Sequence, residues 1–184
     1  MNFTPFPQLT TERLVLRQIS NNDAEEIFIL RSDEQILRYI AQTKAKTMDD
    51  AHQFIKMIND GIKDNKWLFW GITLKDEPHI IGTICIWNIE EENFRAEVGY
   101  SLLPSNQGKG YMRESIEKII DFAFNNLKLH SLAGYVQPEN LASIKVLEKC
   151  QFKKEAHLKE NVCFEGRFID TAIYSLINPN AKRD

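Results

Sequence analysis

The segment Gln107-Gly108-Lys109-Gly110-Tyr111-Met112 is the first place in the chain where residue types and spacing indicate a chemical role. Its two glycines allow consecutive backbone N–H groups to turn toward one point. A helix that starts directly after them adds roughly half a positive charge there, and the Lys109 side chain adds a full one. The segment is therefore a candidate cradle for a phosphate or pyrophosphate.

Two kinds of nucleotide-binding loop do not fit this segment. No Ser or Thr follows Lys109, as a Walker loop requires, and no Gly-x-Gly-x-x-Gly pattern precedes the expected helix. Gly-Lys-Gly also occurs in ordinary solvated turns, so the glycines by themselves leave that alternative open. The elements around the loop must decide between the two interpretations.

Hydrophobic periodicity predicts the elements that hold the loop. Alternating, branched or aromatic residues predict strands over 11–19, 67–74, 80–89, 94–103, 131–136, 152–157 and 167–177. Helical spacing predicts four helices. The first has Asp23 as its N-cap, and the second follows Thr47, which forms a capping box with Asp50. The third begins near Arg113, and the fourth spans 140–150. The glycine loop then joins the strand 94–103 to the helix that starts near Arg113.

Length and composition exclude several classes of protein. The 184 residues are 43% hydrophobic and contain no Pro-, Gly- or Ser-rich linker, so we expect one domain over 1–184. A net charge of −3 argues against a general nucleic-acid binder, and three unclustered cysteines argue against a disulfide framework and a zinc site. No secretory signal or apolar run of ~18 residues is visible, so we expect no membrane span and a cytoplasmic location.

Three separated motifs, in this order, resemble the GNAT superfamily. They are Thr11-Glu12-Arg13-Leu14-Val15-Leu16-Arg17, Glu97-Val98-Gly99-Tyr100-Ser101-Leu102, and Asn140-Leu141-Ala142-Ser143-Ile144-Lys145-Val146-Leu147-Glu148-Lys149. The loop fits the family pattern Arg/Gln-x-x-Gly-x-Gly/Ala through Gln107 and Gly110. Met112 stands where the family prefers Gly or Ala, and Gln151 stands where the family prefers Gly. The likeness runs from about 11 to 177 and is strongest to the ribosomal-protein N-terminal (Rim-type) branch.

This resemblance implies an α/β (α+β) fold, the GNAT acyl-CoA N-acyltransferase fold, with a strongly bent mixed sheet and helices on both faces. It implies acetyl-CoA as cosubstrate. The unclustered His and Cys residues support no metal site. The strands 97–103 and 131–136 would splay apart around the pantetheine arm, and the loop amides would hold the pyrophosphate. The implied cofactor-binding residues are Leu102, Leu103, Gln107, Gly108, Lys109, Gly110, Tyr111, Met112, Asn140 and Ser143.

The resemblance also implies the catalytic residues Glu97 and Ser143. An α-amine has a pKa near 8, so its attack on a thioester needs a proton acceptor, and the departing thiolate benefits from a donor. Glu97 matches the position of the family's base, and Ser143 matches the residue near the CoA sulfur. From the residues alone, Glu97 is equally a solvated strand residue or a partner of Arg95 or Arg113, and Ser143 is equally part of a helix N-terminus.

The expected activity is N-acetyl transfer from acetyl-CoA to a primary amine, in first place a protein N-terminal α-amine. A small-molecule amine such as a polyamine or an aminoglycoside is the enzymatic alternative, and a non-catalytic acetyl-CoA sensor is the alternative from another class. Acceptor choice depends on the segment 32–66, where no motif is readable. The strand 167–177 either pairs across a homodimer or completes the sheet of a monomer.

Overall fold

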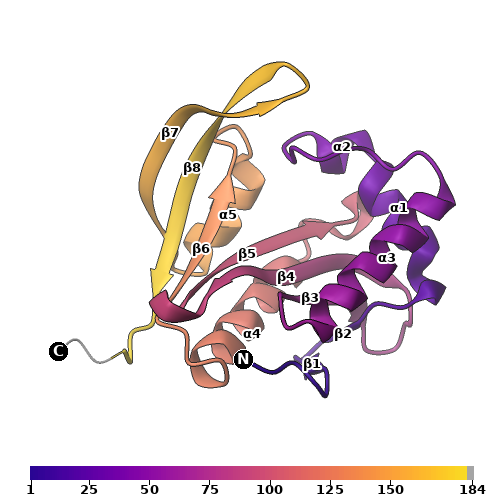
Figure 1. Cartoon of the computed structure of the whole chain (residues 1–184), viewed down its shortest axis with the longest axis horizontal. Helices are drawn as coiled ribbons and strands as arrows, with labels where there is room; N and C mark the ends of the chain where they lie inside the picture. The colour runs from indigo at the N-terminus through magenta and orange to yellow at the C-terminus, as the bar shows by residue number, and fades with distance from the viewer. Residues whose placement is uncertain (182–184) are drawn as a thin grey trace.

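The computed structural model describes residues 1–181, and its strands form one bent, eight-stranded sheet in the order β1-β2-β3-β4-β5-β6-β8-β7 (Figure 1). The strands are β1 (Leu9–Thr10), β2 (Leu14–Gln18), β3 (Leu68–Leu74), β4 (Ile80–Glu90), β5 (Arg95–Leu102), β6 (Ser131–Val136), β7 (Lys153–Phe164) and β8 (Arg167–Ile177). The helices are α1 (Ala24–Ser32), α2 (Glu34–Leu37), α3 (Met48–Lys63), α4 (Tyr111–Asn125) and α5 (Leu141–Lys149).

The one parallel pair of the described sheet, β5 with β6, is also the place where the sheet opens. These strands pair only from Arg95 opposite Ser131 to Glu97 opposite Ala133. Beyond that point β6 keeps its antiparallel pairing with β8 as far as Val136, so it follows β8 and leaves the second half of β5. Figure 1 shows β5 and β6 diverging from this junction. The predicted mixed, bent sheet with splayed strands is confirmed.

Helices cover both faces of the sheet, as predicted. Phe69 and Trp70 are neighbours in β3, so their side chains point to opposite faces. Phe69 meets Phe54 of α3 edge-on at 5.7 Å between ring centroids, whereas Trp70 meets Phe122 of α4 at 5.9 Å. α3 and α4 therefore pack on opposite faces, and Trp70 is a fully buried core residue.

Most predicted elements are confirmed, and the differences have local causes. The capping box of Thr47 and Asp50 forms as predicted at the start of α3. Asp23 stands at the N-cap of α1 without making a cap bond, because its carboxylate instead accepts hydrogen bonds from Ser20 and pairs with Arg17 at 2.6 Å. Gln151 adopts the left-handed φ of 69° expected after α5, which costs on the order of 1 kcal/mol relative to Gly.

Four features were missed or displaced. The short helix α2 lies in the segment 32–66, where the sequence shows no motif, and the small strand β1 was not predicted. α4 begins at Tyr111, directly after the glycine loop, because Gly110 takes the N-cap position. β7 continues beyond 157 to Phe164, since β8 supplies pairing partners along that length.

Candidate active site

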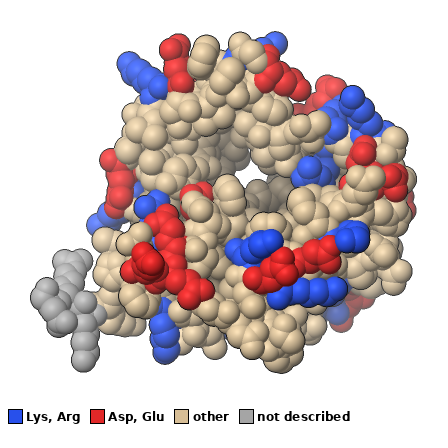
Figure 2. All heavy atoms as spheres, viewed as in Figure 1, with Lys and Arg blue, Asp and Glu red and all other residues tan. Residues whose placement is uncertain are grey.

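A cavity of about 500 Å³ lies between α2, β5, the glycine loop and α5, at the place where β5 and β6 separate. Figure 2 shows the molecule hollowed near the centre of this face. The cavity gathers eight of the predicted site residues: Leu102, Gln107, Gly108, Gly110, Tyr111, Met112, Asn140 and Ser143. It also gathers residues that the sequence did not single out, among them Ile36, Tyr39, Arg113 and Lys149.

The glycine loop presents free backbone donors to this cavity. Gly108 and Gly110 have φ angles of 75° and 83°, a conformation that other residues adopt only at a cost. Gly110 has no side chain to cap α4, so no side chain satisfies the first-turn N–H groups. A Cβ at Gly108 would meet nothing within 4 Å, which leaves open space at the loop. Free donors, open space and a helix N-terminus fit a pyrophosphate.

Met112 and Lys109 differ from the simplest expectation for this loop. The Met112 side chain is buried in the core, so the departure from Gly or Ala at this position leaves its backbone amide facing outward in the first turn of α4. Lys109 does not line the cavity, and its carbonyl accepts a hydrogen bond from Arg13. Arg113 and Lys149 are instead the basic residues of the lining.

Leu102 and Leu103 turn out to have different backbone environments. The Leu103 N–H donates to Ile81 and its carbonyl accepts from the Asn106 N–H, both at 2.9 Å. The Leu103 N–H is thus used within the protein, and its carbonyl has one acceptor position left, so binding of the pantetheine arm by Leu103 stays a prediction. Backbone groups alternate in direction along an antiparallel strand, so the Leu102 N–H points away from β4 and toward the opening.

Arg13 fixes the loop to the sheet. Its guanidinium pairs with Glu114 of α4 at 2.7 Å, donates to the Lys109 carbonyl at 3.1 Å and lies over the Tyr111 ring. The other Glu114 oxygen accepts from Thr11 and from the Arg13 N–H. Burial by itself raises the pKa of Glu114, but these hydrogen bonds outweigh it and lower the pKa, so the carboxylate stays charged at neutral pH. Arg13 is a positioning residue that the motif at 11–17 did not reveal.

We expect Arg13→Ala to raise the Kd for acetyl-CoA about threefold to tenfold, roughly the effect of one lost charge-assisted hydrogen bond on loop order. Isothermal titration calorimetry measures this change. Glu114→Gln is the partner variant. The double variant should bind acetyl-CoA no more weakly than Arg13→Ala alone, because both substitutions remove the same Arg13–Glu114 contact. Additive losses would show that Arg13 does not act through Glu114.

Tyr100 and Ser143 form a hydrogen-bonded pair at the cavity. Their hydroxyl oxygens are 2.7 Å apart, and the Asn140 side chain caps α5 by accepting the Ser143 N–H at 3.1 Å. Asn140 is therefore the N-cap of α5. Burial raises the pKa of the Tyr100 phenol, and its hydrogen bond with Ser143 offsets this only in part. Tyr100 therefore stays protonated at neutral pH and is available as a proton donor beside Ser143.

Glu97 is the last residue of β5 that pairs with β6. It is 8% exposed, and one carboxylate oxygen accepts a hydrogen bond from the Asn88 amide at 2.7 Å. Asn88 lies at an irregularity of β4 with a φ of 46°, which directs its side chain toward Glu97. Glu97 and Tyr100 are three residues apart on one strand, so they point to opposite faces of the sheet. Glu97 does not line the cavity on the Tyr100 side.

Cys85 and Cys150 do not have the character of nucleophiles. Burial raises the pKa of Cys150 to about 11 and that of Cys85 to about 12. Both are therefore thiols at neutral pH, and thiolate is the reactive form. Within residues 1–181, no group of three or more His, Cys, Asp or Glu side chains is arranged to hold a metal ion. Among the helices of the same residues, none combines the length and apolar character needed to cross a membrane.

Comparisons with known proteins agree with this geometry. The sequence model of a family described as an acetyltransferase (GNAT) domain matches residues 13–153. The chain is 36% identical over 169 residues to p20, an uncharacterized N-acetyltransferase of Bacillus licheniformis, and the match covers 92% of this chain and 95% of that one.

Two solved structures are similar over almost the whole chain. A ribosomal-protein-S5-alanine acetyltransferase from Vibrio fischeri has a TM-score of 0.83 and 28% identity, with 96% of this chain and 100% of that chain covered. A spermidine N-acetyltransferase from Vibrio cholerae, in complex with CoA and spermine, has a TM-score of 0.80 and 26% identity, with 91% and 96% covered. The described fold, the cavity and the family match together show that this chain belongs to the GNAT acetyltransferase family.

Proposed function

We propose that this protein transfers the acetyl group of acetyl-CoA to a primary amine, in first place the N-terminal α-amine of a protein. The observation that carries this proposal is the cavity at the junction of β5 and β6, which joins the glycine loop, the free edge of β5 and the Tyr100–Ser143 pair. A binding module without turnover would need the loop alone. The buried Glu97 carboxylate on one face of the sheet and the protonated Tyr100 phenol on the other favour an enzyme.

The cavity fits the parts of acetyl-CoA in sequence. The amides of Gly108 to Met112 would hold the pyrophosphate, with Arg113 and Lys149 adding positive charge at the lining. The Leu102 amide and the Asn140 side chain would bind the pantetheine arm along the free edge of β5. Ser143 would then lie beside the sulfur, since it stands in the first turn of α5 next to Asn140.

The two faces of the sheet would divide the proton transfers. Glu97 would take a proton from the incoming ammonium, directly or through a water molecule, so that nitrogen can form the new N–C bond. As the C–S bond breaks, Tyr100 would give its proton to the departing sulfur, and Ser143 would orient that proton through the 2.7 Å hydrogen bond. The ammonium nitrogen loses two protons on its way to the amide, the first to Glu97 before attack and the second from the tetrahedral intermediate. One proton reaches the thiol through Tyr100, which is then reprotonated, and the other is released to solvent.

We expect Tyr100→Phe to lower kcat about tenfold or more with little change in the Kd for acetyl-CoA. The substitution keeps the ring in place and removes only the hydroxyl that donates. Stopped-assay kinetics and calorimetry measure the two quantities. Ser143→Ala is the companion variant and should give a smaller loss, because Ser143 orients the proton and does not supply it. Equal kcat for Tyr100→Phe and the unaltered protein would exclude the phenol as donor.

Mass spectrometry tests the proposed function. The purified protein is incubated with acetyl-CoA and with ribosomal proteins from a strain that lacks this protein, and new acetyl groups are located by position. Acetylation confined to an N-terminal α-amine supports the proposal. Acetylation of spermidine or of an aminoglycoside in a parallel assay would instead show that the acceptor is a small amine. The likeness to a spermidine N-acetyltransferase is the reason to include this assay. No transfer, with acetyl-CoA bound, would favour a sensor.

A further inference from the structure

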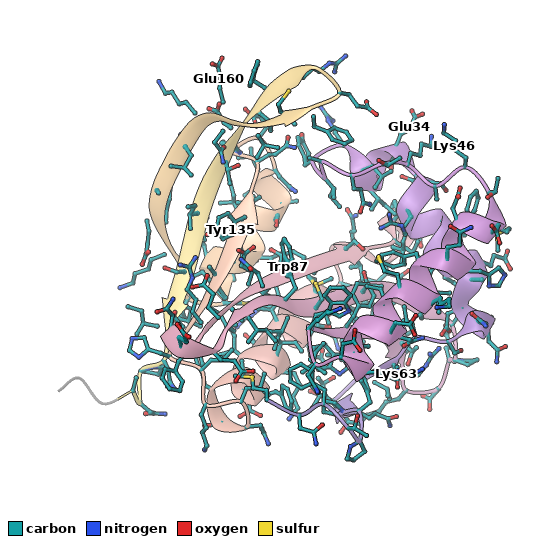
Figure 3. The ribbon with its side chains drawn as sticks, viewed as in Figure 1. Glu34, Lys46, Lys63, Trp87, Tyr135 and Glu160 are labelled. Carbon is teal, nitrogen blue, oxygen red and sulfur yellow. The ribbon has the colours of Figure 1, made fainter. Side chains whose placement is uncertain are left out.

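The sheet face that carries Glu97 is open beside it. Trp87 of β4 lies opposite Glu97 of β5, and Glu97 lies opposite Ala133 of β6, so the three share one face. Tyr135, two residues after Ala133, points to the same face. Trp87 is 47% and Tyr135 43% exposed, although both lie on interior strands of the sheet. Figure 3 shows Trp87 and Tyr135 near each other, on the β5 and β6 side of the sheet.

Trp87 extends its indole across β5. A Cβ built at Gly99 would lie 3.6 Å from the indole nitrogen, so the ring passes beside Gly99, just beyond the last residue that pairs with β6. The indole N–H groups of Trp67 and Trp70 each donate to a backbone carbonyl. The N–H of Trp87 has no acceptor within residues 1–181. An aromatic face and a free donor therefore stand next to Glu97.

The charges on this face favour a single cation. One oxygen of Glu97 accepts from Asn88, which leaves the other free for an ammonium group. Arg95 lies two residues away on the same face, about 7 Å along the strand, and donates to the Tyr135 hydroxyl at 2.8 Å. Within residues 1–181 no carboxylate forms an ion pair with Arg95. A second positive charge on the acceptor would therefore meet a guanidinium.

The acidic turn between β4 and β5 does not reverse this balance. Its carboxylates would attract a polycation if they were free. Glu91 pairs with the α-amine of Met1 at 2.7 Å, and Glu90 accepts a hydrogen bond from Asn93 at 2.8 Å. Two of the three carboxylates in the turn thus already have partners. Glu90 keeps its charge and stands opposite Arg95 in the β4–β5 register. Beside Glu97 the open face thus offers one indole donor, two aromatic rings and the Arg95 cation, which faces Glu90 across the strand pair.

We propose that Trp87, Tyr135 and Arg95 form the acceptor subsite and select a peptide N-terminus over a polyamine. The assignment rests on the proposed function. The α-amine binds at Glu97, the first side chain packs on the Trp87 ring, and the first carbonyl accepts the indole N–H. Tyr135 contacts the second residue. Arg95 disfavours an acceptor with a second amine and favours one with a carbonyl or carboxylate group at that distance.

The test compares four variants against defined acceptors. Trp87→Phe keeps an aromatic ring without the N–H, Trp87→Ala removes both, Arg95→Gln removes the charge, and Arg95→Glu reverses it. The acceptors are tetrapeptides with free N-terminal Ala, Ser or Met, together with spermidine and kanamycin as polycations. KM and kcat are measured for each, and the Kd for acetyl-CoA and the circular dichroism spectrum show whether a variant is folded.

The expected results separate the roles. The unaltered protein should prefer a tetrapeptide, with KM raised about fivefold by Trp87→Phe and more by Trp87→Ala, while the Kd for acetyl-CoA stays within twofold. Arg95→Glu should raise kcat/KM for spermidine about tenfold, and Arg95→Gln should give an intermediate value.

Other results would overturn the assignment. A polycation preferred by the unaltered protein, unchanged KM in both Trp87 variants, or unchanged selectivity in Arg95→Glu would each do so, even if acetyl transfer itself is found. If the folded protein binds acetyl-CoA and acetylates none of these amines, the proposed function fails first, and the assignment fails with it.

Discussion

Replacement of Glu97 by glutamine should lower kcat at neutral pH by about 10² to 10⁴, the usual range for loss of a positioned general base. Glutamine has nearly the same shape, and its side-chain oxygen still accepts the hydrogen bond from Asn88, so the sheet is preserved. The cavity proposed for acetyl-CoA lies on the other face of β5, so the Kd for acetyl-CoA should stay unchanged. Steady-state kinetics with an excess of acetyl-CoA and calorimetry measure the two effects.

The pH profile gives this experiment a second readout. An α-amine loses its own proton above about pH 8, so the need for a base falls as pH rises. The difference between Glu97→Gln and the unaltered protein should therefore narrow between pH 7 and pH 9.5. Glu92→Gln, in the exposed turn after β4, is the matched control and should leave kcat unchanged. Equal loss in both variants, or none in either, would remove Glu97 from the mechanism.

The second large effect is expected at Gly108. Its φ of 75° is left-handed, which Asp and Asn tolerate better than most residues, and a Cβ there would meet nothing within 4 Å. Gly108→Asp places a negative charge where the amides would hold a pyrophosphate. Two like charges about 6 Å apart repel by about 3 kcal/mol at an effective dielectric constant of 20, and solvent reduces this value. We expect the Kd for acetyl-CoA to rise about 10- to 100-fold.

Gly108→Asn separates charge from shape. Asn has the same size as Asp and the same tolerance of this backbone, so it should raise the Kd only a few-fold. Added salt should narrow the gap between the two variants because it screens the repulsion. Calorimetry at two ionic strengths is the measurement. Equal affinities for the Asp and Asn variants would mean that the phosphates do not lie at this loop.

Much of the fold was predictable because its signals are local. The capping box at Thr47 and Asp50, the alternation in β3 and β4, and the left-handed turn at Gln151 each depend on residues within a few positions of one another. The same is true of the glycine loop and the helix that follows it, whose anion-binding character is a property of consecutive amides. Helix α2 was missed because a four-residue helix carries too little periodicity to be seen.

Parts of the candidate site could not be predicted, because they are contacts between distant segments. The hydrogen bond of the Leu103 N–H with Ile81 joins separate segments, and the sequence of the strand does not reveal it. Trp70 and Trp87 are both tryptophans on neighbouring strands, yet one is fully buried and the other half exposed. The packing of the whole sheet decides which face of a strand is covered by a helix. The sequence of one strand does not contain this information.

The sequence by itself determined the family, the order of most elements and the position of the glycine loop, since motifs and periodicity are local features of the chain. The tertiary structure decided where the chemistry can occur. It set the opening between β5 and β6, joined Tyr100 to Ser143, and brought Asn88 to Glu97 through the irregularity of β4. Each of these depends on strand register and on divergence of two strands, which arise only when segments far apart in the chain pack together.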